Sequence, residues 1–209
     1  MWIRRGLGAA RLAARTGACA LAMLALVRAA AAAQPDDADT EVLPEARSRF
    51  AALKPQGVFA QFGVADEVTS GTLGALWNLT GDPVGRRWSV YAEASVGRWQ
   101  SRGGHPSDHG VLTQVALVPV LRWRADEGRS PWFMEGGVGA TVTSSLYRSE
   151  DKHFSTAFNF GDHLGVGFSF GEKAANEIAL RAEHFSNGGI KHPNPGKNFG
   201  QLRFVHRFE

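Results

Sequence analysis

Apolar and polar residues alternate along most of the chain beyond about residue 56, in segments separated by clusters rich in glycine, proline and aspartate. Because successive side chains of a β-strand point to opposite faces, this period of two predicts strands with one apolar and one polar face. The alternation and the turns predict eight strands, over residues 57–64, 71–78, 88–99, 111–124, 132–143, 156–170, 177–186 and 199–208. The chain is therefore expected to be all-β.

The polar faces of these segments carry charged and amide side chains, such as Glu93, Arg122 and Gln201. A soluble β-sandwich would also alternate, with its apolar faces buried. Several predicted strands, however, exceed the usual ~5–6 residues of globular sheets and reach the ~9–11 residues that cross a membrane. We therefore expect an eight-stranded antiparallel outer-membrane β-barrel, whose interior is filled by side chains and leaves no pore.

The barrel would also have interfacial aromatic belts and a fixed orientation. Four tryptophans lie near strand ends, where such belts form: Trp88, Trp99, Trp123 and Trp132. Outer-membrane barrels keep both termini on the periplasmic side and have their longer loops outside. The seventh predicted strand then runs outward, and its end lies at the outer leaflet.

The first 33 residues differ from the rest of the chain. A basic start with Arg4 and Arg5 leads into an apolar segment and an alanine-rich run that ends at Ala33. This order is typical of a cleaved signal peptide, and a membrane anchor is disfavoured because the apolar run is short and Arg28 interrupts it. Residues 34–55 are polar, and we expect a periplasmic tail there before a barrel over residues 56–209.

Composition excludes several functions. The single cysteine, Cys19, lies in the leader, so the mature chain has no thiol for a disulfide or a nucleophile. A formal net charge of +3 without a dense Lys/Arg run gives no basis for nucleic-acid binding. His105, Asp108 and His109 lie close together in sequence, but no further ligands follow at a recognised spacing, and no metal site is expected.

The candidate chemistry lies at the end of the seventh predicted strand. His184 and Ser186 are two residues apart and share a face with apolar Ile178, Leu180 and Ala182. If that face meets lipid, an imidazole and a hydroxyl meet lipid too, where unpaired polar groups are costly. A histidine within about 3 Å of a serine hydroxyl can remove its proton. The pattern favours a serine esterase that acts on a molecule in the membrane.

Neighbouring residues could complete an acyl-transfer site. Asn198 begins the eighth strand on the lipid-facing side, where its amide oxygen could accept the Nδ1 proton of His184. Backbone N–H groups of Asn187 to Gly189, or the side-chain amide of Asn194, could bind an oxyanion, although simple turn chemistry explains Asn187 and both glycines equally well.

Other polar residues nearby have more ordinary explanations beside a functional one. Glu183 should point into the barrel, as an ion-pair partner for an arginine there. Lys191, His192 and Lys197 could contact the phosphate of an anionic lipid, or could be ordinary surface charge.

The run from His184 to Gly196, His-Phe-Ser-Asn-Gly-Gly-Ile-Lys-His-Pro-Asn-Pro-Gly, resembles the active-site segment of the lipid A 3-O-deacylase (PagL) family. Members of that family are eight-stranded outer-membrane barrels that hydrolyse the acyl ester at the 3 position of lipid A. The resemblance implies that His184 is the general base and Ser186 the nucleophile. It places three residues around the oxyanion: Asn187, Gly189 and Asn194.

The resemblance also implies release of a 3-hydroxy fatty acid from lipopolysaccharide in the outer membrane, without a cofactor. Where the family motif has a glutamate, counting forward from His184 reaches Asn198. Either Asn198 orients His184, or the triad is weakened, or another carboxylate serves. The alternatives are a non-catalytic barrel that binds lipopolysaccharide or acts in adhesion, and a soluble periplasmic β-protein with an apolar ligand. The oligomeric state stays open, a homodimer included.

Overall fold

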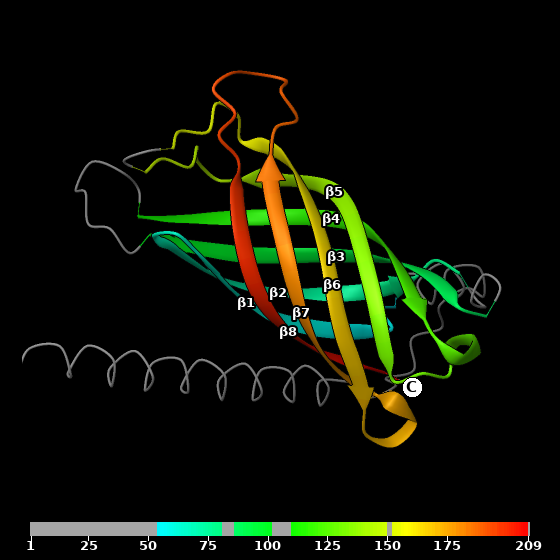
Figure 1. Ribbon diagram of the computed structural model, residues 1–209. Helices are drawn as coiled ribbons and strands as arrows, with labels where there is room; N and C mark the ends of the chain where they lie inside the picture. The colour runs from blue at the N-terminus through cyan, green and yellow to red at the C-terminus, as the bar shows by residue number, and fades with distance from the viewer. Residues whose placement is uncertain (1–53, 81–85, 102–109, 150–151, 209) are drawn as a thin grey trace, which may run out of the picture. The chain divides into compact units, whose positions relative to one another are not determined.

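The computed structural model describes residues 54–80, 86–101, 110–149 and 152–208. Eight antiparallel strands follow one another around a closed barrel, in which β1 pairs with β8 (Figure 1). The strands are β1 (Gly57–Ala65), β2 (Val68–Asn78), β3 (Trp88–Ser101), β4 (Val111–Arg124), β5 (Trp132–Thr143), β6 (Phe158–Phe170), β7 (Asn176–Ser186) and β8 (Lys197–Arg207). The prediction of an eight-stranded antiparallel barrel is confirmed.

Three expectations fall wholly or mostly outside the described residues: the signal peptide, the tail before the barrel, and the cluster of His105, Asp108 and His109. In the part of the chain that the structure describes, no helix is long and apolar enough to cross a membrane. The same part contains no group of three or more His, Cys, Asp or Glu side chains placed to hold a metal ion.

Side chains alternate between the interior and the outer surface of the barrel, as the pattern predicts. On β7, Leu180 is 62% exposed, whereas the adjacent Arg181 is 5% exposed. The outward side chains are mostly apolar, and the barrel therefore presents a hydrophobic surface to lipid. Trp88 and Trp132 are exposed at the starts of β3 and β5, where a belt at the inner interface is expected.

Trp99 is an exception to the predicted aromatic belts. It is 3% exposed and faces the interior, because its odd number on β3 places it on the same face as Tyr91 and Glu93. Its ring packs against Phe185 and Phe199, with centroids 5.0 Å and 4.7 Å away. This aromatic cluster lies inside the outer end of the barrel, beside the end of β7 and the start of β8.

Charged side chains fill the barrel deeper inside. Arg122 binds Glu135 at 2.8 Å and Glu177 at 2.7 Å, and Arg181 binds Glu93 at 2.7 Å and Glu135 at 2.5 Å. Buried charges are tolerated only when they are paired, and each of these side chains has a partner of opposite charge. These paired charges occupy the interior of the barrel among the described residues.

We expect Glu135→Ala to destabilise the barrel strongly. The Glu135 carboxylate accepts hydrogen bonds from Arg122, Arg181 and the Tyr91 hydroxyl, and its removal leaves buried positive charge uncompensated. The free energy of unfolding should fall by about 3–5 kcal/mol, measured as urea unfolding in detergent and as loss of heat-modifiable migration on a gel. Glu172→Ala, at an exposed turn, is the control, and an equal effect of the two variants would contradict the prediction.

Candidate active site

His184 and Ser186 lie together at the outer end of β7, on its lipid-facing side. Both are half-buried, and Phe185 between them points inward. Residues i and i+2 of a strand lie about 6.5–7 Å apart at Cα, a gap that an imidazole leaning along the strand can close. Among the described residues no hydrogen bond joins the Ser186 hydroxyl to His184 or to any other group, and the bond of His184 is to Asn198.

Asn198 holds the other side of the imidazole. It lies directly opposite His184 in the pairing of β7 with β8, and its Oδ1 is 2.5 Å from Nδ1 of His184. Because an amide oxygen only accepts, Nδ1 carries the proton, and Nε2 is left with the lone pair that a general base needs. The arrangement gives His184 the tautomer that can accept a proton from Ser186.

Gly196 supports the same ring from the loop before β8. It is buried with φ +62°, and a Cβ built there would lie 2.6 Å from Cε1 of His184. This left-handed conformation favours glycine, and only glycine leaves room for the imidazole. The glycine that ends the resemblance motif, Gly196, is thus required by the space that His184 occupies.

We expect Gly196→Ala to lower the turnover number by about 10- to 100-fold, because a displacement of a catalytic group by about 1 Å can reduce the rate by that factor. The added methyl group must push His184 away from its bond to Asn198. The rate should be measured on purified, folded protein. Gly171→Ala is the control, since Gly171 also has a positive φ, of +83°, but lies at the turn between β6 and β7. A rate equal to that of the control would show that the added methyl group does not displace His184.

The loop after Ser186 is held by the two predicted oxyanion asparagines. The Asn187 side chain is buried, and its Nδ2 donates to the Lys191 carbonyl at 2.7 Å and to Ser155 Oγ at 3.0 Å. The Asn187 N–H donates to Oδ1 of Asn194 at 3.0 Å, and the Gly189 N–H donates to Oδ1 of Asn187 at 2.9 Å. These bonds order the loop beside the nucleophile.

The predicted oxyanion donors therefore differ in availability. The N–H groups of Asn187 and Gly189 donate within the loop and are not presented to a substrate as they stand. Asn194 uses only its Oδ1 in the described contacts, which leaves its side-chain N–H groups available. The Gly188 N–H likewise has no acceptor among the described residues, and Gly188 is exposed.

Two neighbouring side chains differ from the expectation, Glu183 in its partner and Lys197 in its position. Glu183 points inward as predicted, but its bond is to Gln201 and not to an arginine, because Arg181 already pairs with Glu93 and Glu135. The prediction that Lys197 is a surface charge was wrong. Lys197 is 4% exposed, and its Nζ donates to the Asp66 carbonyl at 2.6 Å. Lys197 begins β8 on the inward side, one residue before Asn198.

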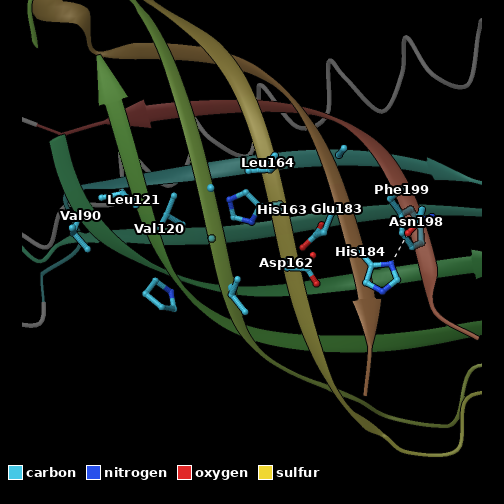
Figure 2. Close-up of a pocket in the computed structure, with 15 residues that line it drawn as sticks. Val90, Val120, Leu121, Asp162, His163, Leu164, Glu183, His184, Asn198 and Phe199 are labelled. Carbon is cyan, nitrogen blue, oxygen red and sulfur yellow. Dashed lines mark hydrogen bonds between the residues drawn. The ribbon is translucent and has the colours of Figure 1, made fainter. Parts of the chain in front are cut away.

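Asp162 is a site residue that the sequence reasoning missed. It lies directly opposite His184 in the pairing of β6 with β7, on the side away from Asn198 (Figure 2). It is half-buried on the outward face, between exposed Phe160 and Leu164. The alternation of even-numbered residues in this segment was the signal that would have placed a carboxylate on the lipid-facing side.

A groove of about 600 Å³ begins at His184, Asn198 and Asp162. Its outward lining comes from two neighbouring rows of residues across the strands. The first row is Asn198, His184, Asp162 and Val138, in register from β8 to β5. The second row is Ala182, Leu164, Gly136, Leu121 and Val90, in register from β7 to β3. Figure 2 labels six residues of these rows: Val90, Leu121, Leu164, Asp162, His184 and Asn198.

The groove descends into the membrane. His184 lies near the outer end of β7, whereas Leu121 and Val90 lie near the inner ends of β4 and β3. Strands of a closed barrel tilt by roughly 35–45°, so a row across the strands changes depth as it passes around the barrel. Gly136 has no side chain and Ala182 has only a methyl group, so neither residue fills the groove.

This sequence is similar to a protein family and to two named relatives. The sequence profile described as lipid A 3-O-deacylase (PagL) matches residues 69–207. Lipid A deacylase PagL of Bordetella bronchiseptica is 35% identical over 156 residues, which cover 73% of this chain and 83% of that protein. Lipid A deacylase PagL of Pseudomonas aeruginosa is 36% identical over 111 residues, which cover 53% and 60%.

A solved structure has the same fold. The crystal structure of the outer membrane enzyme PagL matches with a TM-score of 0.60 and 23% identity, over 73% of this chain and 99% of that chain. This likeness shows the barrel architecture, whereas the sequence match shows the family. The chain belongs to the lipid A 3-O-deacylase family.

Proposed function

We propose that this protein is an outer-membrane serine esterase that hydrolyses the 3-O-linked acyl chain of lipid A. The observation that carries the proposal is the His184–Asn198 pair beside Ser186, at the head of a groove that descends into lipid, in a chain of this family. The relatives named above are lipid A deacylases. Lipid A is the substrate of the proposal, and a homodimer is not needed for it.

Ser186 would act as the nucleophile. Its Oγ attacks the ester carbonyl carbon while Nε2 of His184 takes the hydroxyl proton, and the bond to Asn198 holds the ring in place. The negative charge that develops on the carbonyl oxygen needs donors aimed at it. The side-chain amide of Asn194 and the Gly188 N–H are the available groups near Ser186, and Asn187 and Gly189 shape the loop that holds them.

Three proton transfers then complete the reaction. His184 gives its proton to the leaving oxygen at the 3 position of the sugar, which departs as a hydroxyl and leaves an acyl-enzyme on Ser186. A water molecule attacks this ester with His184 again as the base, and His184 then returns that proton to Oγ of Ser186 as the acyl–oxygen bond breaks. The products are a 3-hydroxy fatty acid, the deacylated lipid A and the free Ser186 hydroxyl. Every group in this cycle belongs to the chain, the substrate or water.

The groove would hold the scissile acyl chain. Its head lies at the catalytic pair, its walls are mostly apolar, and it leads toward the membrane interior, where the acyl chains of lipid A already lie. A chain bound in this way places its ester at Ser186 without leaving the bilayer. An apolar chain in an apolar groove gains contact surface and loses rotational freedom, which favours a fixed position for the ester.

Mass spectrometry of lipid A tests the function directly. We expect cells that express the wild type to lose one 3-hydroxyacyl chain from lipid A and to release the matching free 3-hydroxy fatty acid. Cells with the empty vector are the control. Intact lipid A, with the protein heat-modifiable and present in the outer membrane, would refute the function and favour a barrel that only binds lipopolysaccharide.

A further inference from the structure

The loop between β5 and β6 lies at the same end of the barrel as the loop between β7 and β8 (Figure 1). The structure describes this β5–β6 loop over residues 144–149 and 152–157. Tyr147 and Phe154 in it are buried, and their ring centroids lie 5.3 Å apart in edge-to-face contact. Both belong to the aromatic cluster around Trp99 inside the outer end of the barrel. The β5–β6 loop is therefore anchored in the barrel interior.

Ser155 joins this anchored loop to the loop between β7 and β8, which we call the active-site loop (residues 187–196). The Ser155 hydroxyl donates to the Lys191 carbonyl at 2.9 Å and accepts a hydrogen bond from Nδ2 of Asn187 at 3.0 Å. The same Nδ2 also donates to the Lys191 carbonyl, at 2.7 Å. The three groups thus form a closed set of hydrogen bonds that spans the two loops.

Asn187 connects this set to the groups beside the nucleophile. It directly follows Ser186, and its side chain is buried. Its N–H donates to Oδ1 of Asn194, and its own Oδ1 accepts a hydrogen bond from the Gly189 N–H. The two groups that the proposed reaction uses for the oxyanion are the Asn194 side-chain amide and the Gly188 N–H. A displaced Asn187 would therefore move both of these donors.

The hydrogen bond to Ser155 differs from the other hydrogen bonds of the Asn187 side chain. Among the described residues, its other partners are the Lys191 carbonyl and the Gly189 N–H, which belong to the active-site loop and move with it. Ser155 belongs to the anchored β5–β6 loop. Donors stabilise an oxyanion best when they are held in place before the reaction, so a bond to a fixed support has a direct value for the rate.

We propose that Ser155 is a positioning residue for the proposed esterase reaction. Through Asn187 it holds the oxyanion donors in place, and it contacts neither the substrate nor His184. This inference deepens the proposed function and rests on it for the identity of the substrate. The reactivity of Ser186 can be measured without lipid A, because a fluorophosphonate, a small reagent with no sugar, reacts with an activated serine hydroxyl.

The test compares the wild type, Ser155→Ala and Ser155→Thr in two assays on purified protein in detergent. One assay follows hydrolysis of lipid A, with kcat and KM determined separately. The other follows phosphonylation of Ser186, in which the phosphonyl oxygen needs the same donors as the ester oxygen. We expect Ser155→Ala to lower kcat and the phosphonylation rate by about 10-fold each, with KM little changed, because loosely held donors lose part of their effect. Ser155→Thr keeps the hydroxyl and should recover most of both rates.

Ser144→Ala is the matched control. Ser144 lies in the same loop and its Oγ also accepts a hydrogen bond, but from the Thr113 N–H of β4 and not from the active-site loop. Both of its rates should equal those of the wild type. Ser155→Ala is also combined with Asn187→Ala, and we expect the double variant to be no slower than Asn187→Ala alone, because Ser155 acts through Asn187. All variants should show the heat-modifiable migration of the wild type.

Several results would overturn the proposal. A raised KM with an unchanged phosphonylation rate would make Ser155 a substrate-binding residue. Rates that Ser155→Thr does not recover would show that the hydroxyl is not the cause, and no loss in Ser155→Ala would remove the residue from the mechanism. A further loss in the double variant would show that Ser155 does not act through Asn187.

The same assays separate this inference from the proposed function. If the wild type is phosphonylated but leaves lipid A intact, the proposed function fails, and the phosphonylation rates still decide the role of Ser155. A wild type no more reactive toward the fluorophosphonate than Ser186→Ala would refute both.

Discussion

Ser186→Ala is expected to reduce deacylation of lipid A by about 10⁴- to 10⁶-fold, that is, below detection in cells. The hydroxyl is the only nucleophile that His184 can activate on this face of β7, so its removal stops the formation of the acyl-enzyme. His184→Asn should cost about as much, because residues that act as one unit lose most of their effect when either is removed.

Loss of the Ser186 hydroxyl should leave the stability of the barrel almost unchanged. That hydroxyl has no hydrogen-bond partner among the described residues, and the strand is anchored by the inward Phe185 in its aromatic cluster. We therefore expect a change in unfolding free energy within about 0.5 kcal/mol. Mass spectrometry of lipid A and gel migration of the same cells give both readouts. Wild-type activity in a folded Ser186→Ala protein would rule out Ser186 as the nucleophile.

The fold could be predicted from the sequence because strand alternation is a local property. Each parity of residue numbers belongs to one face, and the structure keeps the predicted faces on β7, including outward His184 and inward Arg181. The same rule would have corrected the placement of Trp99, which was assigned to a belt from its nearness to a strand end alone.

Register between strands is not a local property, and here the sequence reasoning stopped. Nothing in residues 156–170 says that Asp162 lies opposite His184, because this pairing depends on the length of the turn between β6 and β7 and on the tilt of the barrel. The buried position of Lys197 depends in the same way on the carbonyl of Asp66, which is far away in sequence. Asn198 was found because it begins the eighth predicted strand on the lipid-facing side, and counting along the resemblance motif reached the same position.

The groove is the other feature that only the register reveals, and Ala182→Phe tests it. Ala182 faces outward on β7 two residues before His184 and lines the groove beside Leu164. A phenyl ring there occupies the path of the acyl chain just below the catalytic pair. We expect the rate on lipid A to fall by about 100-fold, because an ester displaced by about 1 Å from the nucleophile loses that much.

Leu180→Phe is the matched control. Leu180 lies on the same lipid-facing side of β7 as Ala182, but it is two residues further from His184 and does not line the groove. Both substitutions add an apolar ring to a surface that meets lipid, so both proteins should fold as the wild type does. Phosphonylation of Ser186 by a small fluorophosphonate should stay at the wild-type rate in both, because that reagent does not fill the groove. An Ala182→Phe variant that deacylates lipid A as fast as Leu180→Phe would show that the acyl chain takes another path. If both the lipid A rate and the phosphonylation rate fell together, the ring would be acting on His184 itself, and the groove would not be the cause.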